Sequence, residues 1–497
     1  MGVVFRQSVK TSIITFTGAL LGGIVAIYSS NVMPKQELGF VRLLPIQAVI
    51  ASFFLMVGMN NSLFFYLHRF DEHADAEKKS VLLTVSFGVP LLVYVLGALG
   101  YVLFLDHWLQ FNQEQDRLLM SRYAWCLPLF ALFNLLMMLF EAYLHAHIKA
   151  AQASFVREVL IKGGNLLLFI LFGLRLIPFP VFITLFVGIN LLAVLVLWRM
   201  ASRLADFRFS FQWQRVSRTE YRSILVFALF HALMGISGTL FGFLDSQLLT
   251  TLSRDGLASI PVYTNATFIA TLISIPYRAL SVPASGDISK AYAQNNHDKV
   301  ENAYQRAGLN IFIPSLFMVI LVIGNLHNAV AILRDGYEAV FGITLILLIG
   351  RLGDSATGLN DMALNMSPYY RLNFYLSASI VVLMIVMFHL MIPAFGVYGA
   401  AWVSSGALLL FNLAKAWFVW SKMRLHPFSG GTLKTIGIAA VVWLLTYFIP
   451  HSENPYFDAV WRSILIAVLF AGLVIWVKPS KDISDFLKEV RKKKRLF

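Results

Sequence analysis

The chain has 497 residues, of which 58% are hydrophobic and only 13% are charged. Since an ordinary soluble domain is about one-quarter charged, this composition excludes a soluble protein and indicates an integral membrane protein. The net charge of +14 lies mostly in polar segments on one side of the predicted helices, so it indicates membrane topology and attraction to anionic lipids. We therefore expect no nucleic-acid partner.

Apolar runs recur along the whole chain, and each is long enough to cross a bilayer as a helix. They predict an all-α membrane protein with about fourteen transmembrane helices. No linker between them is long enough to hold a folded soluble domain. The helices are expected near 11–31, 40–67, 81–104, 123–141, 152–174, 178–198, 223–244, 259–280, 305–326, 337–357, 372–391, 396–418, 433–450 and 459–477.

The basic residues predict the orientation of these helices. With the N-terminus inside, 30 of the 40 lysines and arginines fall in segments on the inner side and 7 in loops on the outer side. Since basic residues concentrate on the cytoplasmic side, both termini are predicted to be cytoplasmic and the number of helices to be even.

Six of the predicted helices, an even number, precede the central loop. The seventh helix starts on the same side as the first, so any internal repeat is parallel, with its axis along the membrane normal. We predict an N-terminal six-helix lobe (1–200), a cytoplasmic inter-lobe loop (201–222), a C-terminal six-helix lobe (223–425), an extra helix pair (426–478) and a cytoplasmic tail (479–497).

The tail is basic and amphipathic. Ile483, Phe486, Leu487 and Val490 follow helical spacing, and the run KKKR comes after them. We expect a helix that lies on the inner leaflet and is held by anionic lipids, with a partner-binding tail as the alternative.

Several ionisable residues fall inside the predicted spans, where each costs several kcal/mol unless it faces protein or water. By the predicted topology, most of them lie towards the cytoplasmic face. They are Arg157, Glu158 and Lys162 on the fifth helix, Arg278 on the eighth, and Arg351 and Asp354 on the tenth. Four cations on three helices thus converge at one depth.

Four stretches carry a resemblance to a known family. The sequences MPKQELGF and VGMNNSLFFYL resemble the first hairpin of polysaccharide and lipid-linked oligosaccharide flippases. The segment from FLDSQLLTTL through VYTNATFIATLISIPYRALSVPASGDISKAY resembles their seventh and eighth helices, and FGVYGAAWVSSGALLLF resembles their twelfth. One departure is Pro261, which stands where many relatives have glycine.

This family belongs to the multidrug, oligosaccharidyl-lipid and polysaccharide exporter superfamily. The resemblance implies two six-helix bundles around a central cavity, an extra helix pair, and alternating access. It also implies a bacterial inner-membrane protein that moves an undecaprenyl-pyrophosphate-linked oligosaccharide from the inner to the outer leaflet for surface polysaccharide biosynthesis. Contact with the polysaccharide polymerase machinery is a further expectation.

The resemblance gives the intramembrane charges a role. A diphosphate headgroup carries about two negative charges, and arginine can grip phosphate oxygens in a fork. The predicted substrate-binding residues are Arg157, Lys162, Arg278 and Arg351, with Arg42 on the release side. Glu158 and Asp354 would hold neighbouring cations while the site is empty. The alternative is that these cations extend to lipid phosphates or only mark topology.

A coupling ion, H⁺ or Na⁺, is the remaining small partner. Asp245 lies near the outer end of the seventh helix and could bind it, or could be a solvated helix-end residue. No metal site is expected, because His145 and His147 are two residues apart and point to different helix faces. No phosphate-binding glycine-rich loop occurs, so no nucleotide or other cofactor is expected.

Three other functions compete with the flippase. A cation-coupled drug or metabolite antiporter would share the fold, and a peptidoglycan-precursor flippase would differ only in its glycan. An enzyme such as a membrane glycan polymerase needs a large outer loop. The longest one here, between Leu105 and Arg122, is short, so we expect no enzyme.

Overall fold

The computed structural model describes residues 3–72, 75–293, 297–357, 359–365, 367, 369, 371–480, 482, 483 and 485. Within these residues the chain forms helices and no strand, as the composition predicts. Of the tail, Ile483 lies in the described part, whereas Phe486, Leu487, Val490 and the KKKR run lie outside it.

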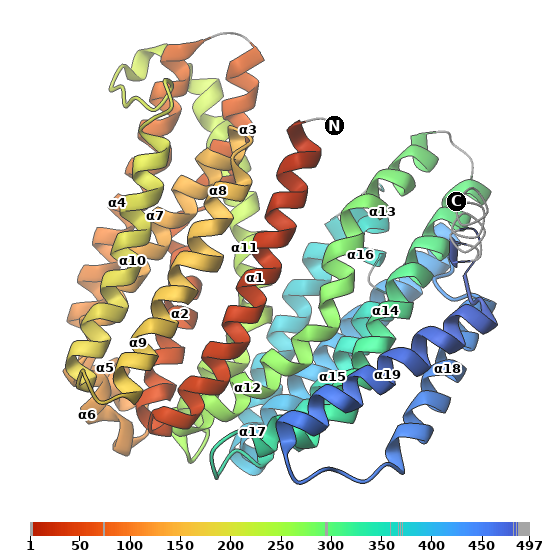
Figure 1. Cartoon of the computed structure of the whole chain (residues 1–497). Helices are drawn as coiled ribbons and strands as arrows, with labels where there is room; N and C mark the ends of the chain where they lie inside the picture. Colours follow the sequence, from red (N-terminus) through yellow and green to blue (C-terminus); the bar gives the residue numbers. More distant parts are fainter. Residues whose placement is uncertain are drawn as a thin grey trace, which may run out of the picture. The chain divides into compact units, whose positions relative to one another are not determined.

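The chain divides into two compact units, residues 1–261 and 262–497. The first unit contains eleven numbered helices in the described residues (Figure 1). They are α1 (Val3–Val32), α2 (Lys35–Met56), α3 (Met59–Glu72), α4 (Ala76–Leu103), α5 (Leu105–Gln110), α6 (Glu114–Arg122), α7 (Cys126–Ala146), α8 (Ala150–Phe155), α9 (Lys162–Gly173), α10 (Phe179–Ala201) and α11 (Arg218–Leu252). A π-helical segment, Val156–Ile161, joins α8 to α9.

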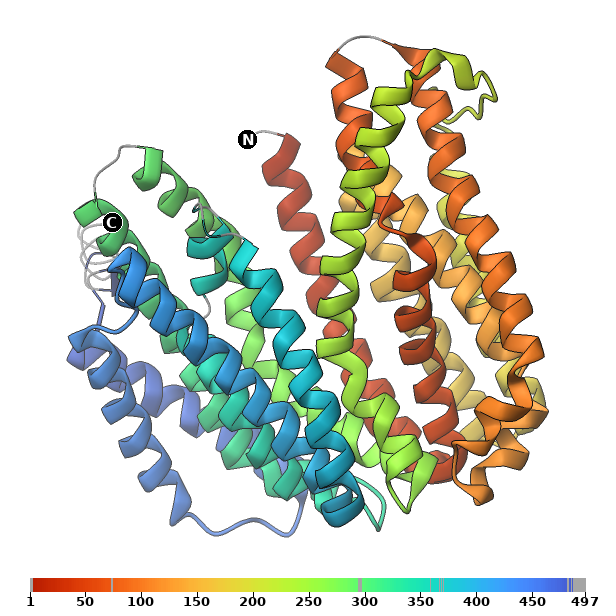
Figure 2. The same cartoon turned by 180° about the vertical axis from the view of Figure 1, so that it is seen from behind.

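The second unit contains the remaining helices, the first of which begins just before the boundary (Figure 2). They are α12 (Ser259–Thr271), α13 (Ile275–Ala293), α14 (His297–Ala331), α15 (Ala339–Thr357), α16 (Asn360–Asn365), α17 (Arg371–Met423), α18 (Gly430–Tyr447) and α19 (Pro455–Val477). Helix α14 contacts α13, α15, α18 and α19, so the final pair α18–α19 packs on its flank.

Twelve helices in the described residues are long and apolar enough to cross a membrane. One of them, α17, contains two helices that meet at Gly396, where the backbone φ is 55° and therefore left-handed. The run α8–π–α9 is a further helical crossing from Ala150 to Gly173. Counting these, the described chain has fourteen crossing segments, which confirms the predicted number.

The second predicted helix, 40–67, is broken in the structure. Helix α2 ends at Met56 and α3 begins at Met59, because Val57 and Gly58 both have positive φ, at 50° and 72°. Gly58 is needed here, since a Cβ at this position would collide with the carbonyl oxygen of Ala228 on α11. The break therefore allows α11 to approach closely.

Helix α11 packs with the first unit, whereas the sequence placed the start of the second lobe at 223. It contacts α2 and α3 along much of its length. Ser62 Oγ donates a hydrogen bond to the Ile224 carbonyl at 3.2 Å, and the rings of Phe65 and Phe227 stack with centroids 4.8 Å apart. These contacts group the seventh crossing with the six before it.

Candidate functional site: charged clusters within the helices

The first cluster begins at the π-helical segment, which carries Arg157 and Glu158. Arg157 reaches across to α7 and donates to both carboxylate oxygens of Glu141, from Nε at 2.8 Å and from a terminal nitrogen at 3.0 Å. This bidentate geometry is the strong form of a charge-assisted hydrogen bond. The wider turn of a π-helix is frequent at functional sites, because it breaks the regular spacing of the side chains.

Lys162 and Glu158 form the second pair of this cluster, as their spacing of four residues predicts. The Lys162 ammonium donates to Glu158 Oε2 at 2.6 Å and to the backbone carbonyl of Gly18 on α1 at 3.0 Å. A Cβ at Gly18 would collide with the Glu158 carboxylate, so a glycine is required where α1 crosses the pair. The cluster thus joins three crossings, α1, α7 and α8–α9.

The depth of Lys162 differs from the sequence-based expectation. Lys162 stands near the middle of the run Ala150–Gly173, about 17 Å along the helix axis from either end at 1.5 Å per residue. The sequence analysis placed it near the cytoplasmic end. A half-buried lysine at this depth is too far from a helix end to serve as a topology marker.

Arg42 on α2 is fully engaged by its own chain. Its guanidinium donates to the carbonyl of Ala26 at 2.9 Å, to the hydroxyls of Ser29 and Ser30 at 2.9 and 3.1 Å, and to the carbonyl of Pro261 at 3.1 Å. These acceptors hold the last turns of α1 beside α2. The geometry therefore favours a structural role for Arg42, in which it joins α1 to α2, over the contact with substrate on the release side that the sequence predicts.

Asp245 on α11 is buried, with 9% of its surface exposed. Its carboxylate accepts from the amide and the hydroxyl of Ser246, at 2.6 and 3.2 Å. This burial argues against the solvated helix-end alternative.

The second unit holds its own cluster, around Asp354 on α15. Asp354 accepts a hydrogen bond of 3.0 Å from the Asn412 amide on α17, and Arg351 lies three residues before it, on the same face of α15. Lys415, also on α17, donates to Asp361 on α16 at 2.8 Å. Arg351 and Asp354 thus share a helix face, and the hydrogen bond that holds Asp354 comes from Asn412.

Lys415 is absent from the predicted site residues, because it is one of the 30 basic residues that the sequence assigns to segments on the inner side. The structure places it inside α17, only 1% exposed, with its ammonium 3.9 Å from the centroid of the Phe411 ring. Its position within the apolar run FNLAKAWFVW was the available signal. Arg278, by contrast, is exposed on α13 and makes no hydrogen bond or ion pair to a described residue.

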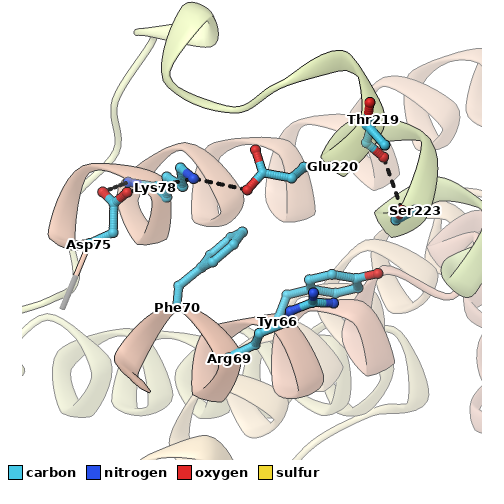
Figure 3. Close-up of a pocket in the computed structure, with 8 residues that line it drawn as sticks. All are labelled: Tyr66, Arg69, Phe70, Asp75, Lys78, Thr219, Glu220 and Ser223. Carbon is cyan, nitrogen blue, oxygen red and sulfur yellow. Dashed lines mark hydrogen bonds and ion pairs between the residues drawn. The ribbon is translucent and has the colours of Figure 1, made fainter. Parts of the chain in front are cut away.

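A cavity of about 220 Å³ in the first unit is lined by none of the residues of the first cluster (Figure 3). It opens between the end of α3 and the first turns of α4 and α11, and Lys78 spans it, with its ammonium 2.9 Å from Glu220 and 3.8 Å from Asp75. Its lining residues are Tyr66, Arg69, Phe70, Asp75, Lys78, Thr219, Glu220 and Ser223. This ion pair ties α4 to α11.

Comparison with known proteins identifies the fold. No known family model and no curated protein matches the sequence. Among solved structures, the Lipid II flippase MurJ in an inward closed conformation matches with a TM-score of 0.71 and 13% identity, over 94% of this chain and 98% of that one. An inward-facing multidrug resistance MATE family transporter of the MOP superfamily matches with a TM-score of 0.64 and 17% identity, over 83% and 98%.

The chain has the MOP-superfamily fold. A MOP-superfamily transporter from Pyrococcus furiosus also matches, with a TM-score of 0.56 and 18% identity over 85% of this chain and 95% of that one. The MOP fold predicted from the short sequence motifs is thereby confirmed, including its all-α, two-lobed architecture.

Proposed function

We propose that this protein is a flippase that moves an undecaprenyl-pyrophosphate-linked oligosaccharide from the inner to the outer leaflet of a bacterial inner membrane, with both termini cytoplasmic. The observation that carries the proposal is the likeness to a lipid flippase over 94% of this chain. It is supported by cations that lie inside the membrane-spanning helices of both units. The process is transport by alternating access and includes no chemical step.

The charged clusters suit a diphosphate headgroup. In the first unit Arg157 and Lys162 are held by Glu141 and Glu158, so each cation is neutralised while no substrate is present. A diphosphate offers oxygens of the same geometry as a carboxylate, and arginine binds both in a bidentate manner. Substrate binding would therefore give each cation a new anionic partner, and the released Glu141 and Glu158 carboxylates would have to face the water of the transport path.

The second unit would supply the first contact. Arg278 is exposed and unpaired among the described residues. The two cations Arg351 and Lys415 are balanced by the two nearby carboxylates, Asp354 and Asp361, so Arg278 adds one positive charge in excess. This excess of one cation would attract an anionic headgroup to the unit. Asp245 and Asp354, both largely buried, are the candidates to bind a coupling H⁺ or Na⁺.

The coverage of the matches favours the flippase over a drug antiporter. The transporter matches extend over 83% and 85% of this chain, whereas the flippase match extends over 94%. A peptidoglycan-precursor flippase remains the second candidate, because that is the activity named for the matching flippase. Contact with a polysaccharide polymerase belongs to the first candidate only.

A reconstituted transport assay tests the proposal. The purified protein is placed in liposomes with fluorescent polyprenyl-diphosphate glycans, one carrying an oligosaccharide and one a peptidoglycan precursor. The fraction of fluorophore that a membrane-impermeant quencher reaches from outside is measured over time. The four-site variant Arg157→Gln/Lys162→Gln/Arg278→Gln/Arg351→Gln should lose at least about tenfold in rate, a loss of roughly 1.4 kcal/mol. The control Arg254→Gln, an exposed cation in the turn after α11, should behave as wild type.

Each outcome distinguishes between the candidate functions. Oligosaccharide movement supports the first proposal, and movement of the peptidoglycan precursor alone supports the second. Normal transport by the four-site variant would reject the charged clusters as a substrate site. Ion-driven drug export with neither lipid moved would reject the flippase.

A further inference from the structure

The loop between α10 and α11, residues 202–217, is fixed to the side of α4. The Ser210 amide donates to Thr84 Oγ1 at 2.9 Å, and two ion pairs flank this bond: Lys79 with Asp206 at 3.4 Å and Arg215 with Glu77 at 2.6 Å. We call this segment the docked loop. The sequence predicts a cytoplasmic inter-lobe loop here, and these contacts hold it against α4 of the first unit.

Aromatic packing fixes the same loop from within. The Phe207 ring packs edge-on against Phe87 and Tyr143, with centroids 6.3 and 5.2 Å apart, and the Phe209 ring is 5.7 Å from Phe87. The next two aromatic residues along the loop are not packed against α4 in this way. Phe211 is 72% exposed and Trp213 is 47% exposed, and their rings contact each other at 5.9 Å.

The depth of the docked loop is set by its contacts on α4. Thr84 and Phe87 lie about 12 and 17 Å along the helix from Ala76, at 1.5 Å per residue. The apolar part of α4 begins at Val81, directly after Lys78, Lys79 and Ser80. The part of the loop around Phe207 and Ser210 therefore lies beside the start of the apolar part of α4, a candidate membrane-spanning helix, and Arg215 returns to Glu77 in the first turn of α4.

Cations without an ion pair to a described carboxylate precede these aromatic residues in the sequence. Arg199 at the end of α10 and Arg203 and Arg208 in the loop are exposed and make no ion pair with a described carboxylate. Trp198, beside Arg199, is 50% exposed. Tryptophan and arginine at one level are typical of the membrane interface, where the ring lies among headgroups and the cation binds lipid phosphate.

We propose that the docked loop is a membrane anchor, which inserts Phe211 and Trp213 into the cytoplasmic leaflet and binds the phosphates of anionic lipids through Arg203 and Arg208. A protein partner fits less well, because the exposed Phe211 directly follows Ser210, which is bonded to Thr84 in the apolar part of α4. The inference concerns the first unit alone and holds whichever substrate the protein carries.

Site-specific fluorescence tests the insertion. The chain has one cysteine, the buried Cys126, so Cys126→Ser gives a background for single labels. Phe211→Cys or Trp213→Cys is labelled with an environment-sensitive dye in liposomes that contain phosphatidylglycerol. We expect quenching by lipids with a nitroxide near the headgroup and protection from aqueous iodide. Asp255→Cys, in the exposed turn after α11, should show the opposite pattern.

A second measurement tests the charge. The double variant Arg203→Gln/Arg208→Gln should reduce the thermal stabilisation that phosphatidylglycerol gives over phosphatidylcholine, and it should reduce its sensitivity to salt. Arg254→Gln should leave both unchanged. Labels at both 211 and 213 that remain open to iodide in every lipid mixture would overturn the anchor and leave a surface for a protein partner. A double variant with unchanged lipid preference would overturn the phosphate contacts.

Discussion

The charged clusters of the two units differ in how their cations are held. In the first unit Arg157 and Lys162 are partly exposed, and each is paired directly with a carboxylate from α7 or from the π-helical segment. In the second unit Lys415 is almost completely buried, while Arg278 is exposed and has no ion pair with a described residue. The first cluster is therefore neutral by itself and suited to exchanging partners, whereas the second combines a structural ion pair with a cation that no described carboxylate neutralises.

The largest expected effect is on the fixed pair of the second unit. Asp361→Asn leaves the Lys415 ammonium buried without its carboxylate, and removing one partner of a buried pair costs about 3–5 kcal/mol. Since Asp361 is 40% exposed, we expect a loss of about 2 kcal/mol after solvent screening, measured as thermal unfolding in detergent. The double variant Lys415→Met/Asp361→Asn should recover most of it. Equal stability of all variants would contradict a structural pair.

A change on α1 tests whether the first cluster depends on close packing. Gly18→Ala places a methyl group against the Glu158 carboxylate and should destabilise the unit by about 1–2 kcal/mol, since overpacking forces neighbours to shift. Gly163→Ala is a matched control, because a Cβ there meets nothing within 4 Å. Thermal unfolding of the two variants should differ. If they unfold alike, α1 does not lie tightly against the pair.

The proposed exchange of partners predicts that one substitution in the first cluster strengthens substrate binding. Glu158→Gln removes the carboxylate that neutralises Lys162 and leaves the Gly18 carbonyl as its acceptor. We expect a few-fold lower KM for a diphosphate lipid, because the substrate no longer competes with a carboxylate. Asp354→Asn in the second unit should not lower KM in this way. A raised KM for Glu158→Gln would reject the exchange.

The smallest effect concerns the segment after α19. Arg306 on α14 hydrogen-bonds the Asp482 carboxylate, and this contact, with a second one from Asn310, lowers the pKa of Asp482 below 3.8. Its stabilisation is present above pH 4 and is lost as the pH falls through the lowered pKa. Because Arg306 is exposed, we expect less than about 1 kcal/mol. Asp482→Asn should lower Tm at pH 7 and match the wild type near pH 2.

The sequence predicted correctly those features that depend on residues close together in the chain. The length of apolar runs predicted the number of crossings, and the spacing of Glu158 and Lys162 predicted their pairing. It was less informative where residues distant in sequence meet. The break at Val57–Gly58 depends on the approach of Ala228, and the partners Glu141, Gly18 and Asn412 come from other helices. Lys415 lies near the end of a span, where a lysine resembles a loop charge.

The π-helical segment Val156–Ile161 has a consequence for how Lys162 could be released from α1. A π-turn holds one residue more than an α-turn, so its conversion to α-helix shifts the register of everything after it by one position. One position in an α-helix corresponds to a rotation of about 100°. Such a shift would swing the ammonium from the Gly18 carbonyl towards another face of the helix, so a local rewinding would act as a rotary switch for a charge deep in the membrane.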